Sequence, residues 1–333
     1  MTGIEDYGVY LPRYRLPLKE YGKGLGQVRE SGFEEKRVND FDEDAVTMAV
    51  EAARVLLSRR PRPGKDITYM GVATTTGPYD GRVMGGTLGA MLGLGNEVFS
   101  SEHTSSPKAG LEALIEALGR SDEALVVAGE VPAGTPRSSW EEGSGAAAAA
   151  ILTGSGDLLA RAEACASFCE ERLGLGVRAR GEADFLDLGI PSLLAESYET
   201  CVMGAIRGLL EKTGSDLADY RFVVLPHPGG ALPGQLARKA GITEEQAAPA
   251  RVFRLLGNLN SAGPLVGLAA ALDMADPQDR ILVASFAPGS GSDALALSVT
   301  DRILEHPGAG LDHMLSSGQV LDFFTYARLR SFV

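Results

Sequence analysis

The chain contains 333 residues with a formal net charge of -13, and hydrophobic residues make up 44% of it. That length can bury a large core, either as one α/β unit or as two half-sized domains, so size is no obstacle to an enzyme. The acidic balance excludes general binding to nucleic-acid phosphates or to an anionic membrane surface, because both partners need clustered Lys and Arg.

Short apolar runs alternate with segments of helical period in the first half of the chain, a pattern typical of a layered α/β fold with buried sheets. The clearest helix covers residues 42–59, whose first turn is rich in acidic side chains that the helix dipole stabilises. The five alanines at 146–150 fit a buried strand or a closely packed helix. This half also contains a predicted helix at 108–118 and predicted strands at 4–10, 68–73, 124–129 and 146–152.

The same order of strand, loop and helix returns in the second half. This recurrence indicates that one α/β unit is duplicated, with an N-terminal half at 1–155 and a C-terminal half at 156–333. A turn-rich stretch at 153–157 marks the boundary, and the acidic, glycine-rich residues 174–189 are expected to form a lid or an excursion from the fold. We predict helices at 192–213, 232–240 and 264–274 and strands at 222–225, 281–286 and 294–299.

The cysteines indicate a reducing compartment. Cys165, Cys169 and Cys201 are odd in number and match no disulfide framework, so we expect a cytoplasmic protein. Cys165 and Cys169 lack a second pair and the histidines lie far away in the sequence, so no metal site is expected. The N-terminus lacks the apolar segment of a signal peptide and no run of about 18 apolar residues occurs, so we expect neither secretion nor membrane insertion.

His227 is the most suggestive polar residue. It follows the apolar run 222–225 and precedes Pro228-Gly229-Gly230, so it is predicted to lie where a strand opens into a loop. Strand ends are where α/β enzymes place reactive side chains. The alternative is a histidine that is satisfied in a turn by its own backbone.

A second candidate site is the turn at 257–264, which contains Asn258, Asn260 and Ser261 and precedes an apolar helix. A helix N-terminus offers backbone donors and a positive dipole end to an anion or a polarised carbonyl. Ser261 or Asn260 could equally serve only to cap the helix. Together, a His and an Asn could direct N–H donors at a thioester oxygen and stabilise the enolate or oxyanion that forms there.

A third candidate is the polar run at 102–110, which leads into a helix. The helix dipole would lower the pKa of a nucleophile at that point, but Ser105 or Ser106 would also need a base such as His227 or His103. Alternatively, Thr104 or one of the serines caps the helix, with a proline at its first position.

The glycine-rich stretch 287–293 joins two predicted strands. It is not a phosphate-binding loop, because no helix follows and no Gly-Lys-Ser/Thr sequence is present. The stretch instead predicts a tight hairpin whose backbone approaches a neighbouring site.

These features resemble the HMG-CoA synthases, in particular the shorter archaeal and bacterial kind, within the thiolase superfamily. The similarity runs from residues 8–15 through the helix at 42–54 to residues 326–330, so it spans nearly the whole chain. Its most specific stretch is 257–293, where the Asn-containing turn, the next helix, the next strand and the Gly-Ser-Gly-Ser-Asp loop follow in the family's order.

The resemblance implies an α/β thiolase fold of five layers, αβαβα, made of two similar halves. It also implies an obligate homodimer, a tunnel for the pantetheine arm of coenzyme A, a coenzyme A thioester as substrate and no tightly bound cofactor. In condensing members a Cys takes the acyl group, a His and an Asn hold the second thioester, and a Glu handles protons. His227 and Asn258 match the family's His and Asn.

The other two catalytic groups of the family are missing. Where relatives carry the nucleophilic Cys, this chain has Ser105 and Ser106 ahead of Lys108. Where relatives carry the Glu, it has residues 74–79, with Thr75 in that place. Because general acid/base catalysis contributes about 10²–10⁴-fold, we do not expect ordinary HMG-CoA synthesis by the usual ping-pong route.

Three functional hypotheses follow. In the first, Ser106 is activated by His227 and accepts an acyl group in an acyltransferase or condensing reaction. In the second, His227 and Asn258 polarise a β-hydroxyacyl or β-ketoacyl thioester for aldol or retro-aldol chemistry with no covalent step. In the third, the chain is a catalytically silent subunit that binds coenzyme A and scaffolds a thiolase and an OB-fold/zinc-ribbon protein, as the resemblance to archaeal relatives implies. We favour an enzyme, because the His and Asn serve no obvious purpose without chemistry.

The thioester carrier is either coenzyme A or acyl carrier protein. Lys108 and Lys239 are candidate partners for the phosphates of coenzyme A, and the other candidate substrate-binding residues are Ser261, Gly289 and Gly291.

Overall fold

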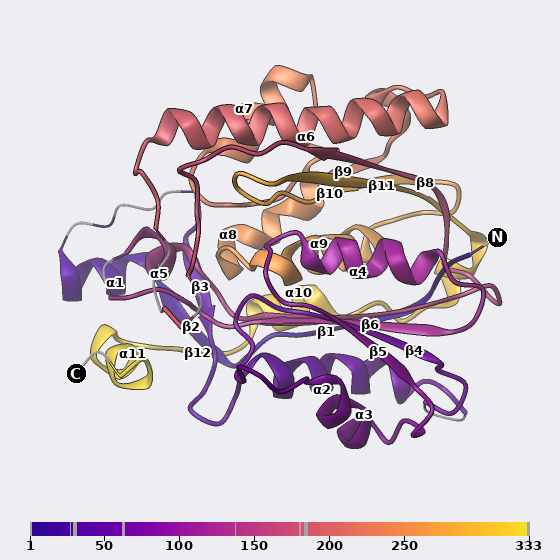
Figure 1. The fold of residues 1–333 in the computed structure, drawn as a ribbon, viewed down its shortest axis with the longest axis horizontal. Coiled ribbons are helices and arrows are strands. Elements are labelled where there is room, and N and C mark those ends of the chain that lie inside the picture. The colour runs from indigo at the N-terminus through magenta and orange to yellow at the C-terminus, as the bar shows by residue number, and fades with distance from the viewer. Residues whose placement is uncertain are drawn as a thin grey trace.

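The computed structural model describes residues 2–26, 28, 32–61, 64–136, 138–179, 181–182 and 186–331. Its elements form layers in the order helix, sheet, helix, sheet, helix (Figure 1). One outer layer contains α2 (Ala45–Leu57) and α3 (Gly85–Leu92), and the other contains α6 (Pro191–Thr213) and α7 (Leu232–Ala240). Between the two sheets lie α4 (Ala109–Leu118) and α9 (Gly263–Asp273), as the layered α/β expectation requires.

The strands form one hydrogen-bonded series, β5-β4-β6-β7-β1-β8-β11-β10-β9. Only two residue pairs, Gly3 with Arg161 and Ile4 with Ala160, join β1 to β8, so the series divides there into the two sheets of Figure 1. The first sheet contains β1 (Gly3–Tyr10), β4 (Tyr69–Ala73), β5 (Phe99–His103), β6 (Ala124–Glu130) and β7 (Ala147–Gly154). The second contains β8 (Ala160–Cys169), β9 (Phe222–Val224), β10 (Arg280–Ala284) and β11 (Gly291–Val299).

The two sheets share one strand order. In the first, β4-β6-β7-β1 are neighbours, and in the second β9-β10-β11-β8 are neighbours, with the same sequence of elements along the chain. The recurrence that indicated a duplicated α/β unit is therefore present in the topology. The chain passes from one set to the other between Gly154 and Ala160, and the division at residue 155 stays a prediction.

A small sheet, β12-β2-β3, lies beside the layers. Because β12 (Gln319–Val320) pairs with β2 (Tyr14–Pro17), the C-terminal segment packs against the N-terminal half. The remaining elements are β3 (Glu35–Val38), α1 (Leu18–Leu25), α5 (Ser139–Gly143), α8 (Phe253–Leu256), α10 (Leu311–Ser316), α11 (Phe323–Leu329) and the 3-10 turns Leu217–Asp219, Ala248–Val252, Asn260–Ala262 and Asp301–Glu305.

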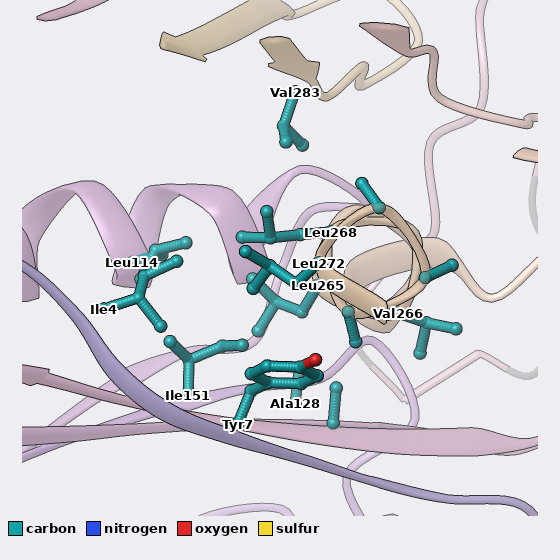
Figure 2. Packing of buried hydrophobic residues seen from close by; sticks show 14 of the residues in the cluster. Ile4, Tyr7, Leu114, Ala128, Ile151, Leu265, Val266, Leu268, Leu272 and Val283 are labelled. Carbon is teal, nitrogen blue, oxygen red and sulfur yellow. The ribbon is translucent and has the colours of Figure 1, made fainter. Parts of the chain in front are cut away.

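The apolar core between the sheets explains the composition of α9. All its residues from Gly263 to Leu272 are buried, because a helix in a central layer contacts protein on every side. Figure 2 shows its leucines facing Leu114 of α4 and Ile4 and Ile151 of the first sheet, with Val283 on the opposite sheet.

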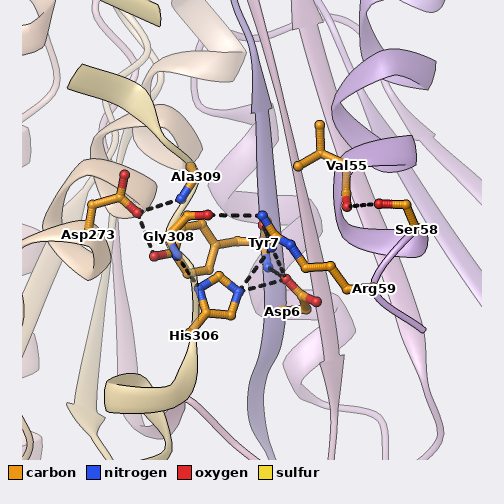
Figure 3. Close-up of polar contacts among 9 residues, drawn as sticks. All are labelled: Asp6, Tyr7, Val55, Ser58, Arg59, Asp273, His306, Gly308 and Ala309. Carbon is orange, nitrogen blue, oxygen red and sulfur yellow. Dashed lines mark hydrogen bonds and ion pairs between the residues drawn. The ribbon is translucent and has the colours of Figure 1, made fainter. Parts of the chain in front are cut away.

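A polar cluster ties the C-terminal segment to this core (Figure 3). Asp6 Oδ1 accepts a hydrogen bond of 2.7 Å from Arg59 and lies 2.9 Å from His306 Nε2. The hydroxyl of Tyr7 donates to Asp273 at 2.6 Å, and Asp273 also accepts from the backbone N–H of Ala309 at 2.7 Å. These contacts join β1 to the turn that follows α2, to α9 and to the segment that follows β11.

The predicted elements are found with small shifts at their ends, but five strands were not predicted: β2, β3, β5, β8 and β12. Residues 102–103 lie in β5 rather than in a polar run before a helix. Only Ala160 and Ala166 of β8 are buried, and the exposed charged residues Arg161 and Glu163 interrupt its apolar pattern. Outer and edge strands carry polar residues, so their apolar pattern is weak.

Residue 180 and residues 183–185 of the expected lid or excursion lie outside the described residues. Within the described remainder, Val177 and Leu186 pair in an antiparallel bridge, and the lid stays a prediction. Among the described residues no helix is long and apolar enough to cross a membrane. Those residues also contain no group of three or more His, Cys, Asp and Glu that could hold a metal ion, and the three cysteines are free.

Candidate active site

Two adjoining cavities contain the residues predicted to be catalytic. The smaller, about 30 Å³, is lined by His227, Asn258 and Asn260 among others. The larger, about 920 Å³, is lined by Thr75 and Ser106 among others. A water needs about 10–15 Å³ by this measure and ligand sites occupy about 300–1,000 Å³, so the smaller cavity has room for one or two small groups and the larger has room for a ligand. Both are lined by Pro107, Trp140 and Pro288.

His227 lies directly beyond β9, where the strand end is held by a 2.7 Å hydrogen bond from the Tyr198 hydroxyl to the carbonyl of Pro226. Its ring packs against Phe253 with 5.6 Å between centroids. Burial lowers the pKa of His227 to about 4, against a smaller opposing effect of its own backbone, so the imidazole is neutral at pH 7. Its Nδ1 is buried and forms no hydrogen bond within the described part of the chain.

The neutral state of His227 makes stability depend on pH. The pKa of His227 in the folded state is about 4, whereas the ordinary pKa of a histidine is 6.5, so between these pH values the unfolded chain binds more protons. We expect the contribution of His227 to the free energy of unfolding to be complete above pH 6.5. This contribution should fall by up to about 3 kcal/mol as the pH drops towards 4. Urea unfolding at pH 7 and 4.5 measures this loss, which should be smaller in His227→Gln. An equal loss in both proteins would contradict this assignment.

Hydrogen bonds of its backbone fix the position of Asn258, and a hydrogen bond of its side chain sets the orientation of its amide group. Its N–H donates to the carbonyl of Gly143 at 2.8 Å, and its carbonyl accepts from Gly145 at 2.9 Å. Its Oδ1 accepts the backbone N–H of Asn260 at 2.9 Å, so the amide nitrogen is the end available to donate towards the cavity. The preceding Gly257 has φ +80 and approaches Gly143 so closely that a Cβ would meet its carbonyl at 2.8 Å, which explains the glycine.

Asn260 and Ser261 do not cap α9, although capping was one interpretation of this turn. The N-cap is Ala262 and no side chain bonds there. Asn260 instead has the left-handed φ of 40, and its buried Oδ1 forms no hydrogen bond among the described residues. The small cavity is therefore lined by two residues with unpaired buried polar atoms, His227 and Asn260, which is unusual outside functional sites.

Ser106, the predicted acyl acceptor, has no base hydrogen-bonded to it within the described residues. Its Oγ accepts the backbone N–H of Lys108 at 3.3 Å, and no hydrogen bond joins it to His227 in the described structure. The ring of His103 instead lies 3.1 Å from Glu116 on α4. Neither a serine nor Thr104 is the N-cap of α4, which begins at Ala109 after Lys108. The interpretation that placed a proline at the first helical position is therefore wrong.

Helix α4 packs directly on the turn that carries Asn258. A Cβ on Gly110 would meet the carbonyl oxygen of Ser261 at 2.0 Å, so only glycine permits this approach. The start of α4, with Ser106 just before it, is thereby placed against residues of the opposite half of the chain.

Thr75 lies beyond β4 and contacts the carboxylate of Glu130, which was not predicted from the sequence to be a site residue. Its backbone N–H and hydroxyl donate to Glu130 at 2.6 and 2.9 Å. The hydroxyl of Thr76 also donates to Glu130, at 3.0 Å, and the hydroxyl of Ser261 donates to its other oxygen. Glu130 is 0% exposed, and burial raises its pKa against the opposing effect of these donors. The available signal was an acidic residue ending the apolar strand β6.

The candidate substrate-binding residues lie away from both cavity linings. The ammonium of Lys108 lies 2.7 Å from Glu112 and 3.0 Å from Asp293. Lys239, on the outer helix α7, pairs with Glu199. Ser261 is fully buried against Glu130.

The predicted hairpin between β10 and β11 is present, closed by the N–H of Ala287 donating to Gly291 at 2.9 Å. Gly289 and Gly291 have positive φ angles of 71 and 133. Their neighbours Pro288 and Ser290, rather than the glycines, line the larger cavity. Arg82 and Arg178 also line it and were not anticipated.

Comparison with known proteins finds similar sequences of one kind. No family model matches the chain. The hydroxymethylglutaryl-CoA synthase of Pyrobaculum aerophilum is 31% identical over 345 residues, covering 100% of this chain and 98% of the relative. The enzyme of the same name from Methanocella arvoryzae is 32% identical over 338 residues, covering 98% and 96%.

Solved structures show the same fold. An HMG-CoA synthase in complex with CoA superposes with a TM-score of 0.89 at 16% identity, covering 98% of this chain and 89% of that one. The HMG synthase of the curacin biosynthetic pathway in complex with acetyl donor-ACP gives 0.88 at 21% identity, covering 98% and 88%. The layers of Figure 1 are therefore those of the thiolase fold. By its similarity to the archaeal synthases over its whole length, the chain belongs to the HMG-CoA synthase family.

Proposed function

We propose that this chain is an enzyme that acts on acyl thioesters of coenzyme A or acyl carrier protein, with the thioester in the larger cavity and its carbonyl oxygen directed to His227 and Asn258. The observation that carries the proposal is the pair of donor residues in a small, mostly apolar cavity that adjoins a ligand-sized one. The relatives support the substrate class, since one was solved with CoA and another with an acetyl donor-ACP.

The two donors suit a developing oxyanion. A neutral imidazole donates an N–H without surrendering its proton, and the low pKa of His227 keeps the ring in that form. The amide nitrogen of Asn258 is the second donor, because its oxygen is already engaged by Asn260. Such a pair stabilises an enolate, which serves aldol or retro-aldol chemistry on a β-hydroxyacyl or β-ketoacyl thioester with no covalent intermediate.

A second mechanism retains Ser106 as an acyl acceptor, since it lines the larger cavity just before the N-terminus of α4. No base is hydrogen-bonded to Ser106 within the described residues, which favours the mechanism without a covalent intermediate. Intact-mass spectrometry after incubation with acyl-CoAs separates the two, because only the covalent course adds one acyl group at Ser106.

Binding can be followed through Trp140, the only tryptophan of the chain, which lines both cavities. We expect acetyl-CoA and 3-hydroxybutyryl-CoA to change its emission saturably, because the ligand replaces water beside the indole. Arg82→Ala should weaken binding, whereas Arg207→Ala, at an exposed position on the outer helix α6, serves as the matched control and should not. If titrations by fluorescence and by calorimetry both showed no binding of any thioester, the proposed substrate class would be wrong.

The homodimer and the thiolase and OB-fold/zinc-ribbon partners stay predictions. The dimer is supported by β5, which lies at the end of the strand series with Phe99 63% exposed. A strand edge that is not paired within the described residues favours association with another chain.

A further inference from the structure

Glu130 is an unusual carboxyl group for a protein core. It is 0% exposed, and its hydrogen bonds within the described residues come from neutral donors of Thr75, Thr76 and Ser261. A buried carboxylate is normally paired with a cation, because desolvation of the charge is costly. No cation takes part in this network among the described residues, and burial raises the pKa of Glu130, so its carboxylate accepts a proton more readily than an exposed one.

The position of Glu130 links the two cavities. Thr75, which donates to Glu130 Oε2 through its hydroxyl, lines the larger cavity. Ser261, which donates to Oε1, belongs to the turn whose residues Asn258 and Asn260 line the smaller one. One hydroxyl therefore connects the carboxyl group to the space where a ligand fits, and another holds the turn that carries the oxyanion donor.

The chemistry proposed above also needs a base, and His227 is poorly suited to that role. A catalytic base works best when its pKa lies near the operating pH, but burial moves the pKa of His227 down to about 4. Burial moves the pKa of Glu130 up from 4.5, towards that range.

We propose that Glu130 takes up and returns a substrate proton through the hydroxyl of Thr75. In this step the Cα–H bond of the thioester breaks and its proton moves to Thr75 Oγ1, while the proton of that hydroxyl moves to Glu130 Oε2. The electron pair of the broken bond enters the enolate, whose oxygen accepts from His227 and Asn258. The reverse transfer restores the C–H bond, so no other reactant is consumed. Glu130 is a positioning residue that acts through Thr75, and this inference rests on the proposed function.

Deuterium incorporation measures this step directly. The full-length protein is incubated with acetyl-CoA in D₂O, and deuterium at the α-carbon is followed by mass spectrometry. We expect Glu130→Gln and Thr75→Val to lower the exchange rate by on the order of 10²-fold or more, because each interrupts the transfer. Thr75→Ser keeps the hydroxyl and should retain exchange.

Thr76→Val is the matched control. Thr76 donates to the same carboxylate oxygen of Glu130 as Thr75 but is not part of the cavity lining. If Glu130 had only a structural role, Thr75→Val and Thr76→Val would therefore lower the exchange rate equally. We expect Thr76→Val to retain most of the exchange rate. Glu130→Asp should retain part of it and shift the midpoint of the pH-rate profile, which a structural role would not move.

The possible outcomes separate this inference from the proposed function. Suppose that the wild-type protein binds acetyl-CoA. If Glu130→Gln and Thr75→Val then exchange as fast as the wild type, or if the wild type does not exchange at all, Glu130 does not transfer the substrate proton. The proposed thioester binding is unaffected by either result. If the wild type does not bind any thioester, the proposed function fails and this inference fails with it. Should Glu130→Gln not fold, the comparison of Thr75→Val with Thr75→Ser decides the matter.

Discussion

Replacing His227 with alanine is expected to lower turnover of a thioester by about 10²–10³-fold, the loss typical of removing one oxyanion donor. The imidazole is neutral and lines the small cavity together with Asn258, so its N–H stabilises charge that develops only during the reaction. The measurement is the rate of α-deuteration of acetyl-CoA, together with binding followed through Trp140. Binding should change little, because the donor acts on the transition state more than on the bound thioester.

The control is His313→Ala, since His313 is exposed on α10 away from both cavities. This variant should exchange at the wild-type rate. If His227 and Asn258 act on one oxygen, the double alanine variant should lose little more than the worse single variant, because groups that act as a unit are not additive. Full activity in His227→Ala would remove the imidazole from the mechanism.

Replacing Lys36 with methionine is expected to destabilise the fold by about 3–5 kcal/mol, because it leaves a buried carboxylate without its cation. The Lys36 ammonium lies 3.1 Å from Glu141, and their side chains are 2% and 0% exposed. Burial lowers the pKa of Lys36 to about 8 even against the attraction of Glu141. The hydroxyls of Tyr21 and Tyr326 also donate to Glu141, so this carboxylate joins α5 to α1 and to the C-terminal helix α11.

Chemical unfolding of the variant measures the loss. Lys23→Met is the matched control, because Lys23 forms an exposed pair with Glu20 and should cost about 1 kcal/mol or less. The double variant Lys36→Met/Glu141→Gln should recover part of the stability, since the buried charge is then gone. Since Glu141 follows Trp140, we also expect the tryptophan emission of Lys36→Met to change. A loss as small as that of Lys23→Met would contradict this account of the buried pair.

Local sequence signals predicted the fold well where an element carries its own pattern. Helix α9 was anticipated because a Gly/Ser-rich turn precedes a continuous apolar run, and α7 because its ends carry clear signals. His227 and Asn258 were found because a strand end and a glycine-rich turn mark them locally, and the structure brings both to one cavity.

Long-range contacts explain what the sequence could not predict. Ser261 was interpreted as a cap or a substrate contact, but its hydroxyl bonds to Glu130, 131 residues away in the chain. The partners of Glu130 come from two segments, 75–76 and Ser261, that only the layered fold brings to it. Lys36 and Glu141 are separated by 105 residues, so their pairing had no local signature.

The most direct test of the central claim is a crystal structure of the protein with an analogue of acetyl-CoA in which a methylene group replaces the thioester sulfur. The account predicts that the pantetheine arm occupies the larger cavity beside Trp140. It also predicts that the ketone oxygen lies within hydrogen-bonding distance of a ring nitrogen of His227 and of the amide nitrogen of Asn258. A ketone oxygen directed away from both residues, or an analogue bound outside these cavities, would contradict it.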